Sequence, residues 1–254
     1  MKILVLPDMH NKDGSPTEHL GHIGQFIVDK RPDVIIHLGD FADMPSLSLY
    51  DVGKKCFEGR SYAKDIQASH NAMRILLAPL FALQCKQKRN KEKVYNPRRI
   101  MLLGNHENRI NRAVELDRKL EGLMSIDDLL YTEFGWEVVG FLEKIKLNGV
   151  LFSHYFTSGE MGRAITSPAA LLTKKHISCV MGHNQKDGIA SQYTGDDKRI
   201  TGIFAGACYL HHEDYLGPQG NVHWRGVWML HDVHEGEFEP MQVSLKFLKE
   251  RYGN

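Results

Sequence analysis

The feature that most constrains this chain is a pattern that occurs five times, a short aliphatic run followed at once by Asp, His or Asn. The clearest copy is residues 100–103, which run into Gly-Asn-His-Glu at residues 104–107. A continuous aliphatic run is typical of a strand buried on both faces of a sheet. The other copies begin at Ile3, Val34, Val150 and Cys179. Because the carboxyl ends of parallel strands meet at one edge of a sheet, the pattern predicts that these polar residues gather there.

Length and composition restrict the classes of protein that remain. The 254 residues suffice for one large α/β domain, and a formal net charge of +1 gives no overall attraction to nucleic acid or anionic membranes. No apolar run approaches the roughly 20 residues that cross a bilayer, and the N-terminus enters a strand without a signal-peptide pattern. The four cysteines form no Cys-x-x-Cys pair, so neither a disulfide framework nor a zinc knuckle is indicated. We therefore expect a reduced, cytoplasmic protein.

The first two strands are predicted to be parallel neighbours. Between them, Leu20, Ile23 and Ile27 keep helical spacing after a capping residue, Thr17, and Pro32 cannot continue the helix. A strand, a helix and a strand in this order favour a right-handed parallel crossover.

The segment at about residues 44–97 is expected to be an insertion. It is irregular at first and then helical over about residues 63–85, with Pro79 expected to kink the helix or end it early. A basic run follows, made of Lys86, Lys88, Arg89, Lys91, Lys93, Arg98 and Arg99. We favour a solvated helix end and loop. The alternative is a rim that attracts a polyanionic substrate.

The second half of the chain is predicted to contain more strands than helices. Asn148-Gly149 indicates a hairpin, and residues 167–175 form a helix with Ser167 as its cap. From Ile189 onward only strands are expected, forming an antiparallel sheet that packs beside the parallel one. Residues 1–254 are thus expected to be a single α/β domain, a β-sandwich flanked by helices.

The polar residues at the five strand ends form an ordered series. In chain order the blocks are Asp-x-His (Asp8, His10), Gly-Asp-x-x-Asp (Asp40, Asp43), Gly-Asn-His-Glu (Asn105, His106, Glu107), His154 and Gly-His-x-Gln (His183, Gln185). A cap, a turn or a hydrogen-bonded core histidine explains each residue alone, but these explanations would all have to hold together. The series resembles the signature of the calcineurin-like metallophosphoesterase family, over residues 3–185. The run around Gly104 and Gly135-Trp136 is also similar to small phosphoesterases of phage or prophage origin.

The resemblance implies a fold and an activity. The fold is a four-layer α-β-β-α sandwich with mixed sheets, and the activity is that of a metal-dependent phosphoric ester hydrolase. Carried over by position, the first divalent metal ion takes Asp8, His10, the bridging Asp40 and Gln185, and the second takes Asp40, Asn105, His154 and His183. Such mixed ligands suit manganese, with iron, zinc, nickel or cobalt as alternatives. Two ions about 3.5–4 Å apart would activate a bridging hydroxide for in-line attack on phosphorus.

The remaining site residues are expected to act beside the metal ions, in catalysis or in orienting the ligands. His106 resembles the family's catalytic histidine, which protonates the leaving oxygen or stabilises charge on the phosphoryl group. Asp43 and Glu107 are expected to orient the ligands or His106. Arg109 either clamps a phosphate or lies, with Arg112, on a solvated helix face.

Gln185 is a departure from the family pattern, which has histidine at this position. An amide oxygen is a weaker ligand for these ions than imidazole, so the first metal is expected to bind less tightly than the second. His37 is interpreted as a core residue. His211, His212 and Glu213 fall in a predicted turn, where a metal role is the less favoured interpretation.

Three functions remain open. The first is hydrolysis of phosphate mono- or diesters of a phosphorylated small molecule, including nucleotides. The second is a nuclease acting on DNA or RNA, and the third is a scaffold or binding protein with little activity. A protein phosphatase is disfavoured because residues 39–45 lack the arginine-containing continuation found in that group.

Overall fold

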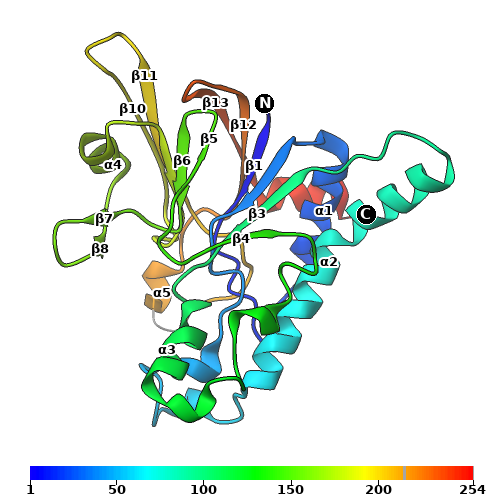
Figure 1. Ribbon diagram of the computed structural model, residues 1–254, viewed down its shortest axis with the longest axis vertical. Helices are drawn as coiled ribbons and strands as arrows, with labels where there is room; N and C mark the ends of the chain where they lie inside the picture. The colour runs from blue at the N-terminus through cyan, green and yellow to red at the C-terminus, as the bar shows by residue number, and fades with distance from the viewer. Residues whose placement is uncertain (214–215, 254) are drawn as a thin grey trace.

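Parallel β-strands at the centre of the molecule carry most of the predicted polar residues. The computed structural model describes residues 1–213 and 216–253 (Figure 1). The first sheet has the order β13-β12-β1-β2-β3-β4. Its strands are β1 (Ile3–Leu6), β2 (Val34–His37), β3 (Arg98–Leu102), β4 (Glu137–Val139), β12 (Gly226–His234) and β13 (Glu237–Ser244). Strands β1 to β4 run parallel, whereas β12 and β13 pair antiparallel beside β1. The predicted parallel pairing of β1 and β2 is confirmed.

A second mixed sheet packs face to face with the first. Its order is β10-β11-β9-β6-β5. Its strands are β5 (Ile145–Leu147), β6 (Val150–Ser153), β9 (Cys179–Met181), β10 (Asp187–Tyr193) and β11 (Arg199–Ala205). The β5–β6 hairpin turns at Asn148 and Gly149, which have φ angles of 42° and 90° as the primed hairpin turns require.

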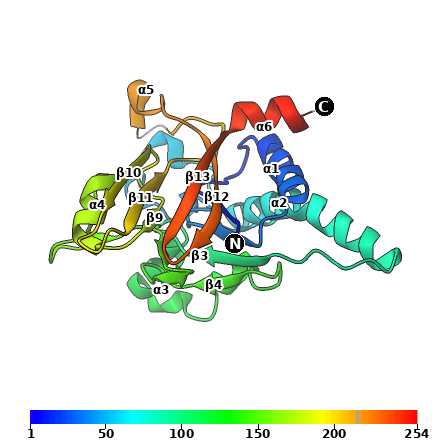
Figure 2. The same ribbon diagram turned by 90° about the horizontal axis from the view of Figure 1, so that it is seen from above.

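Helices cover the outer faces of both sheets. They are α1 (Glu18–Lys30), α2 (Tyr62–Arg89), α3 (Asn108–Leu116), α4 (Pro168–Lys175), α5 (Gly217–Gly220) and α6 (Leu245–Tyr252). Short 3-10 turns are η1 (Pro45–Leu47), η2 (Lys55–Phe57), η3 (Arg118–Leu120) and η4 (Ile126–Leu129), and β7 (Thr157–Ser158) and β8 (Arg163–Ala164) form a small ribbon. Figure 2 shows α4 on one side of the sheets and α1, α2 and α6 on the other.

The hydrophobic core is divided among the layers. Leu4, Leu6 and Ile35 pack with residues of α1 and α2. The opposite face of the same strands, including Val5, packs with residues of the second sheet such as Phe152. A smaller cluster lies under α4. The predicted four-layer α-β-β-α sandwich with mixed sheets is therefore confirmed within the residues that the structure describes.

The segment at residues 44–97 supplies part of the outer helical layer. Leu76 and Leu80 of α2 are fully buried, and Gly24 of α1 lets the two helices approach, since a Cβ there would lie 2.5 Å from the Leu76 carbonyl oxygen. The prediction that Pro79 kinks α2 or ends it early is wrong about the end, because the helix continues to Arg89. That residues 1–254 form one domain stays a prediction.

Two predictions for the C-terminal part are wrong. The late strands form no separate antiparallel sheet: β10 and β11 extend the second sheet, and β12 and β13 extend the first. The chain also returns to helix, since α6 follows β13 with Ser244 as its cap and buries Leu245 and Leu248 against the core beside α1. In the described part of the chain, no helix is long and apolar enough to cross a bilayer.

Candidate metal centre and active site

The predicted ligands lie in loops that follow the carboxyl ends of strands from both sheets. Asp8, Asp40 and Asn105 follow β1, β2 and β3, while His154 and His183 follow β6 and β9. Several of these loops turn back sharply. His10, Asp40, His183 and Gln185 have φ angles of 45°, 54°, 67° and 55°. Left-handed backbone at non-glycine residues is uncommon and clusters at functional sites.

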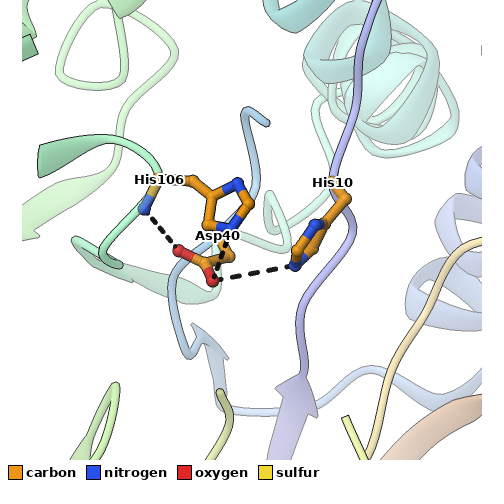
Figure 3. A group of neighbouring side chains, drawn as sticks. All are labelled: His10, Asp40 and His106. Atoms are coloured by element: carbon orange, nitrogen blue, oxygen red, sulfur yellow. Dashed lines mark hydrogen bonds and ion pairs between the residues drawn. The ribbon is translucent and has the colours of Figure 1, made fainter. Parts of the chain in front are cut away.

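Asp40 occupies the middle of the constellation (Figure 3). Its Oδ2 atom lies 3.7 Å from Nε2 of His10, 3.9 Å from Nε2 of His106 and 3.4 Å from Nε2 of His154. Its Oδ1 atom accepts a hydrogen bond of 2.9 Å from the His106 backbone N–H. Burial by itself raises the pKa of Asp40, but the three surrounding histidines outweigh it and hold the pKa of this carboxyl well below its usual range. A buried carboxylate between two sets of imidazoles has the position expected of a bridging ligand.

The second set of ligand atoms converges on Asn105. Its Oδ1 atom lies 2.9 Å from Nε2 of His154 and 2.8 Å from Nδ1 of His183. His154 Nδ1 lies 2.8 Å from the Leu38 carbonyl oxygen, which can only accept, so Nδ1 carries a proton and Nε2 is the nitrogen that faces Asn105 and Asp40. Burial, followed by the neighbouring His154, lowers the pKa of His183 and favours its neutral form.

These atoms fit a divalent cation. Nε2 of His154 faces the Asn105 amide oxygen and the Asp40 carboxylate, which can only accept, so either a proton on Nε2 or a cation among the three groups satisfies them. Among the described residues, Oδ2 of Asp8 is also buried without a hydrogen-bond partner. Two groups of candidate ligands share Asp40: it meets His10 and His106 in one group, and His154 and His183 in the other.

His106 is held by a carboxylate. Its Nδ1 atom lies 2.7 Å from Oδ1 of Asp43 and 2.9 Å from the Asp43 carbonyl oxygen. Burial raises the pKa of Asp43, but the hydrogen bond from His106 and its charge outweigh this and keep the pKa well below its usual range. Arg109 donates a hydrogen bond of 2.8 Å from Nη1 to the Asp43 carbonyl oxygen, and its Nη2 atom lies 3.4 Å from Nε2 of His106. Arg109 thus lies beside His106, whereas Arg112 is exposed.

Glu107 ties the loops of two strands together. Its Oε2 atom accepts from the backbone N–H groups of Asp40 and Gly104, both at 2.9 Å, and Oε1 accepts from Ala42 N–H at 2.9 Å. Burial, with the nearby charge of Asp40, raises the pKa of this carboxyl. Glu107 therefore fixes the backbone that presents Asp40, and its role in orienting the ligands stays a prediction.

Gln185 reaches His10, a predicted ligand of the first metal ion, but its oxygen is engaged elsewhere. The Oε1 atom of Gln185 accepts a hydrogen bond of 2.9 Å from the Tyr209 hydroxyl, and its Nε2 atom lies 3.3 Å from Nε2 of His10. The amide oxygen expected to bind metal is thus directed at Tyr209 here. The role of Gln185 as a ligand stays a prediction.

Sequence reasoning missed a buried polar cluster behind His10. Glu213 is only 4% exposed, and its Oε1 atom lies 2.9 Å from Lys12 Nζ, 2.7 Å from His211 Nε2 and 3.5 Å from Nδ1 of His10. The only hint in the sequence is the run of His211, His212 and Glu213, placed in a predicted turn. Lys12 and Glu213 are 201 residues apart in the sequence, so no local sequence pattern indicates their contact.

The site opens into two cavities that share His106 and Arg109. One, of about 600 Å³, is lined by Asp40, Asn105 and His183 together with Tyr50 and Lys54. The other, of about 340 Å³, is lined by Lys12, Asp43, Arg60, Lys64 and Glu213 among others. The first is the cleft that exposes the candidate ligands.

The basic run does not border this cleft. Arg98 pairs with Val34 at the amino end of β3, while the candidate ligands follow the carboxyl ends. Residues 88–93 are exposed at the end of α2 (cyan in Figure 1), on the side of the sheet away from α3. The alternative interpretation of the basic run, as a rim that attracts a polyanionic substrate to the site, is therefore wrong. The favoured interpretation, a solvated helix end and loop, agrees with the structure. His37 is fully buried in β2, as expected for a core residue.

Comparisons with known proteins identify the class. The family model described as calcineurin-like phosphoesterase matches residues 1–214. No curated protein matches the chain significantly in sequence. Among solved structures, the chain is similar to Yfce, a phosphoesterase from E. coli, at 12% identity and a TM-score of 0.41, covering 96% of this chain and 100% of that one. A second solved structure gives 10% identity, a TM-score of 0.40 and coverage of 96% and 99%. Structural similarity at this level carries no argument about function.

The match of the family model over most of the chain is decisive. The chain belongs to the calcineurin-like phosphoesterase family, a class of metal-dependent hydrolases of phosphate esters. The family match ends one residue after Glu213 and leaves β12, β13 and α6 outside it.

Proposed function

We propose that this protein hydrolyses phosphate mono- or diesters with two divalent metal ions bound around Asp40, manganese being the metal that suits the ligands best. The observation that carries the proposal is the position of Asp40, whose Oδ2 atom lies 3.7, 3.9 and 3.4 Å from Nε2 of His10, His106 and His154 and which belongs to two groups of candidate ligands. Asp8 and His10 would hold the first ion together with Asp40. Asn105, His154 and His183 would hold the second with the same carboxylate.

The ions, when bound, supply positive charge and an acidified water for in-line attack on phosphorus. The chain's own groups do the rest. Asp43 accepts a hydrogen bond from Nδ1–H of His106, so that Nε2 faces the cleft. When the ring is protonated on both nitrogens, Nε2–H is the group that gives its proton to the leaving oxygen, and the ring is left neutral. Arg109 Nη2, 3.4 Å from that atom, places a second positive charge where the phosphoryl group would bind.

A small phosphorylated molecule is the substrate that the cleft supports best. The cavity of about 600 Å³ has the size of a small-molecule site, and Tyr50 and Lys54 at its wall offer a ring face and a cation. The basic run at residues 88–93 lies away from the cleft, which removes the main argument for a nuclease. The four cysteines are all free, which supports the proposed cytoplasmic location.

A metal-supplemented screen tests the proposal. Protein stripped with a chelator is assayed with Mn, Fe, Co, Ni, Zn or Mg against p-nitrophenyl phosphate, its bis ester, cyclic nucleotides, and single- and double-stranded DNA. We expect no hydrolysis without metal and hydrolysis with manganese, lost again in Asp40→Ala. If the pure protein hydrolyses none of these with any metal, a scaffold with little activity is the better interpretation.

A further inference from the structure

A buried carboxylate lies behind His10, on the side away from the candidate metal position. Nε2 of His10 faces Oδ2 of Asp8 at 3.8 Å and Oδ2 of Asp40 at 3.7 Å. The opposite ring nitrogen, Nδ1, faces Oε1 of Glu213 at 3.5 Å and Oδ1 of Asp43 at 3.9 Å. His10 is fully buried, so neither nitrogen can turn to solvent.

Nδ1 of His10 needs an acceptor, and Glu213 is the one placed to supply it. In the described chain this nitrogen has no hydrogen bond that meets normal geometry. Two carboxylate oxygens face this nitrogen, and Oε1 of Glu213 at 3.5 Å is closer than Oδ1 of Asp43 at 3.9 Å. A movement of about half an ångström would bring Oε1 of Glu213 to ordinary hydrogen-bond distance.

Glu213 is itself held firmly. Lys12 Nζ binds both of its oxygens, at 2.9 and 3.0 Å, and also contacts Oδ2 of Asp43 at 2.9 Å. His211 Nε2 lies 2.7 Å from Oε1, and the ring of His211 stacks on Tyr209 at 4.6 Å between centroids. These partners keep the carboxylate beside His10, and Lys12 offsets the cost of burying its charge.

We propose that Glu213 is a positioning residue of the first metal site. Its carboxylate accepts a hydrogen bond from Nδ1–H of His10 and so leaves the lone pair of Nε2 for the ion that Asp8 and Asp40 would also hold. A carboxylate behind a metal-binding histidine fixes its tautomer and orientation and makes it a stronger ligand. The five strand-end motifs do not include this residue.

The proposal also bears on the glutamine that departs from the family pattern. With its oxygen accepting from Tyr209, Gln185 supplies less to the first ion than an imidazole would. Tyr209 packs between His10, at 5.4 Å, and His211. Glu213 thus strengthens the first site through His10, in a chain that has Gln185 in place of the second imidazole ligand.

The inference rests on the proposed metal site, and binding rather than activity tests it. Mn²⁺ is titrated into stripped protein, and free Mn²⁺ is followed by electron paramagnetic resonance. In Glu213→Gln, which keeps the shape and loses the charge, we expect the dissociation constant of one site to rise about 10–100-fold. The other site should bind as in the parent. Glu115→Gln, an exposed carboxylate on α3, is the matched control and should titrate as the parent does.

A second measurement separates positioning from general support. The visible absorption spectrum of the Co²⁺-loaded protein should change in Glu213→Gln, because the orientation of His10 toward the ion changes, and Glu213→Asp should restore the parent spectrum in part. Equal Mn²⁺ affinities in Glu213→Gln and the parent would overturn the inference alone. Equal weakening of both sites with a lower unfolding temperature would also overturn it, since that outcome indicates only structural support. A parent protein that binds no Mn²⁺ or Co²⁺ would overturn the inference together with the proposed function.

Discussion

Nδ1 of His106 lies 2.7 Å from Oδ1 of Asp43, and this contact decides which nitrogen of His106 faces the cleft. The carboxylate and the carbonyl oxygen of Asp43 accept hydrogen bonds from Nδ1–H of His106, so Nε2 is directed toward Asp40, at 3.9 Å from its Oδ2 atom. His106 comes from the loop after β3 and Asp43 from the loop after β2, so the pair depends on the parallel pairing of these strands.

His106→Ala should separate catalysis from metal binding. We expect turnover to fall roughly 10²–10⁴-fold, the range for a positioned acid–base group, while metal content stays close to that of the parent. Asp40→Ala should lose metal and activity together, because it removes the carboxylate between both ligand groups. Turnover and bound metal are measured on the same samples. Equal metal loss in both variants would remove His106 from the proposed catalytic role.

Asp43→Asn should lower turnover by about 10–100-fold, the usual effect of losing a supporting carboxylate. The amide can present its N–H to Nδ1 of His106, which would stabilise the wrong tautomer. The rate is measured at saturating metal, with Asp13→Asn as the exposed control. A variant that turns over as fast as the parent would contradict the proposed role of the pair.

Gln185→His should lower the Mn²⁺ concentration that gives half-maximal activity, by about tenfold if the imidazole joins the first ion. The physical reason is that imidazole is a stronger ligand than an amide whose oxygen accepts from Tyr209. Activity is titrated against free Mn²⁺, with Tyr209→Phe as a second variant to isolate the effect of that hydrogen bond. If Gln185→His titrates as the parent does, position 185 makes no contribution to metal binding.

Neutralising Lys88, Arg89, Lys91 and Lys93 to Gln should leave hydrolysis of a small aryl phosphate unchanged. These side chains are exposed at the end of α2, away from the carboxyl ends of the strands. Binding of DNA, where present, should keep its salt dependence. A flatter dependence on salt in this variant would mean that these residues contact phosphates after all.

His19 should make the folded protein less stable as the pH falls. Burial lowers the pKa of His19 to about 4, and the ring donates from Nε2 to the Cys208 carbonyl oxygen at 3.1 Å. The unfolded chain has an ordinary histidine pKa of about 6.5, so it takes up the proton first. Stability is therefore retained above pH 6.5 and lost between pH 6.5 and 4, by up to about 3 kcal/mol.

Urea unfolding of the stripped protein at several pH values measures this loss. His19→Gln should have a flatter profile than the parent, and His234→Gln, at an exposed position, should follow the parent. Parallel profiles for the parent and His19→Gln would show that His19 is not the group responsible.

Much of the sandwich and the order of the site residues were predictable from local patterns. Aliphatic runs such as those at Ile3 and Val34 have no stable place other than a buried strand, and the chain carries the polar residue that follows each strand to the edge where parallel strands end. The resemblance to a family then depends on residue types and spacing alone. Residue types and spacing can be recognised in the sequence without knowing which strands pair.

Other features were decided only by the tertiary structure. Strands β10 to β13 share one type of pattern, yet two join each sheet, because pairing is chosen by packing against non-local neighbours. The location of the basic run away from the cleft and the direction of the Gln185 oxygen are equally non-local. Glu213 meets Lys12 across 201 residues, because a carboxylate buried beside His10 is costly unless a cation neutralises it. Linear sequence has no pattern for such a contact, since it exists only after the two chain segments have packed together.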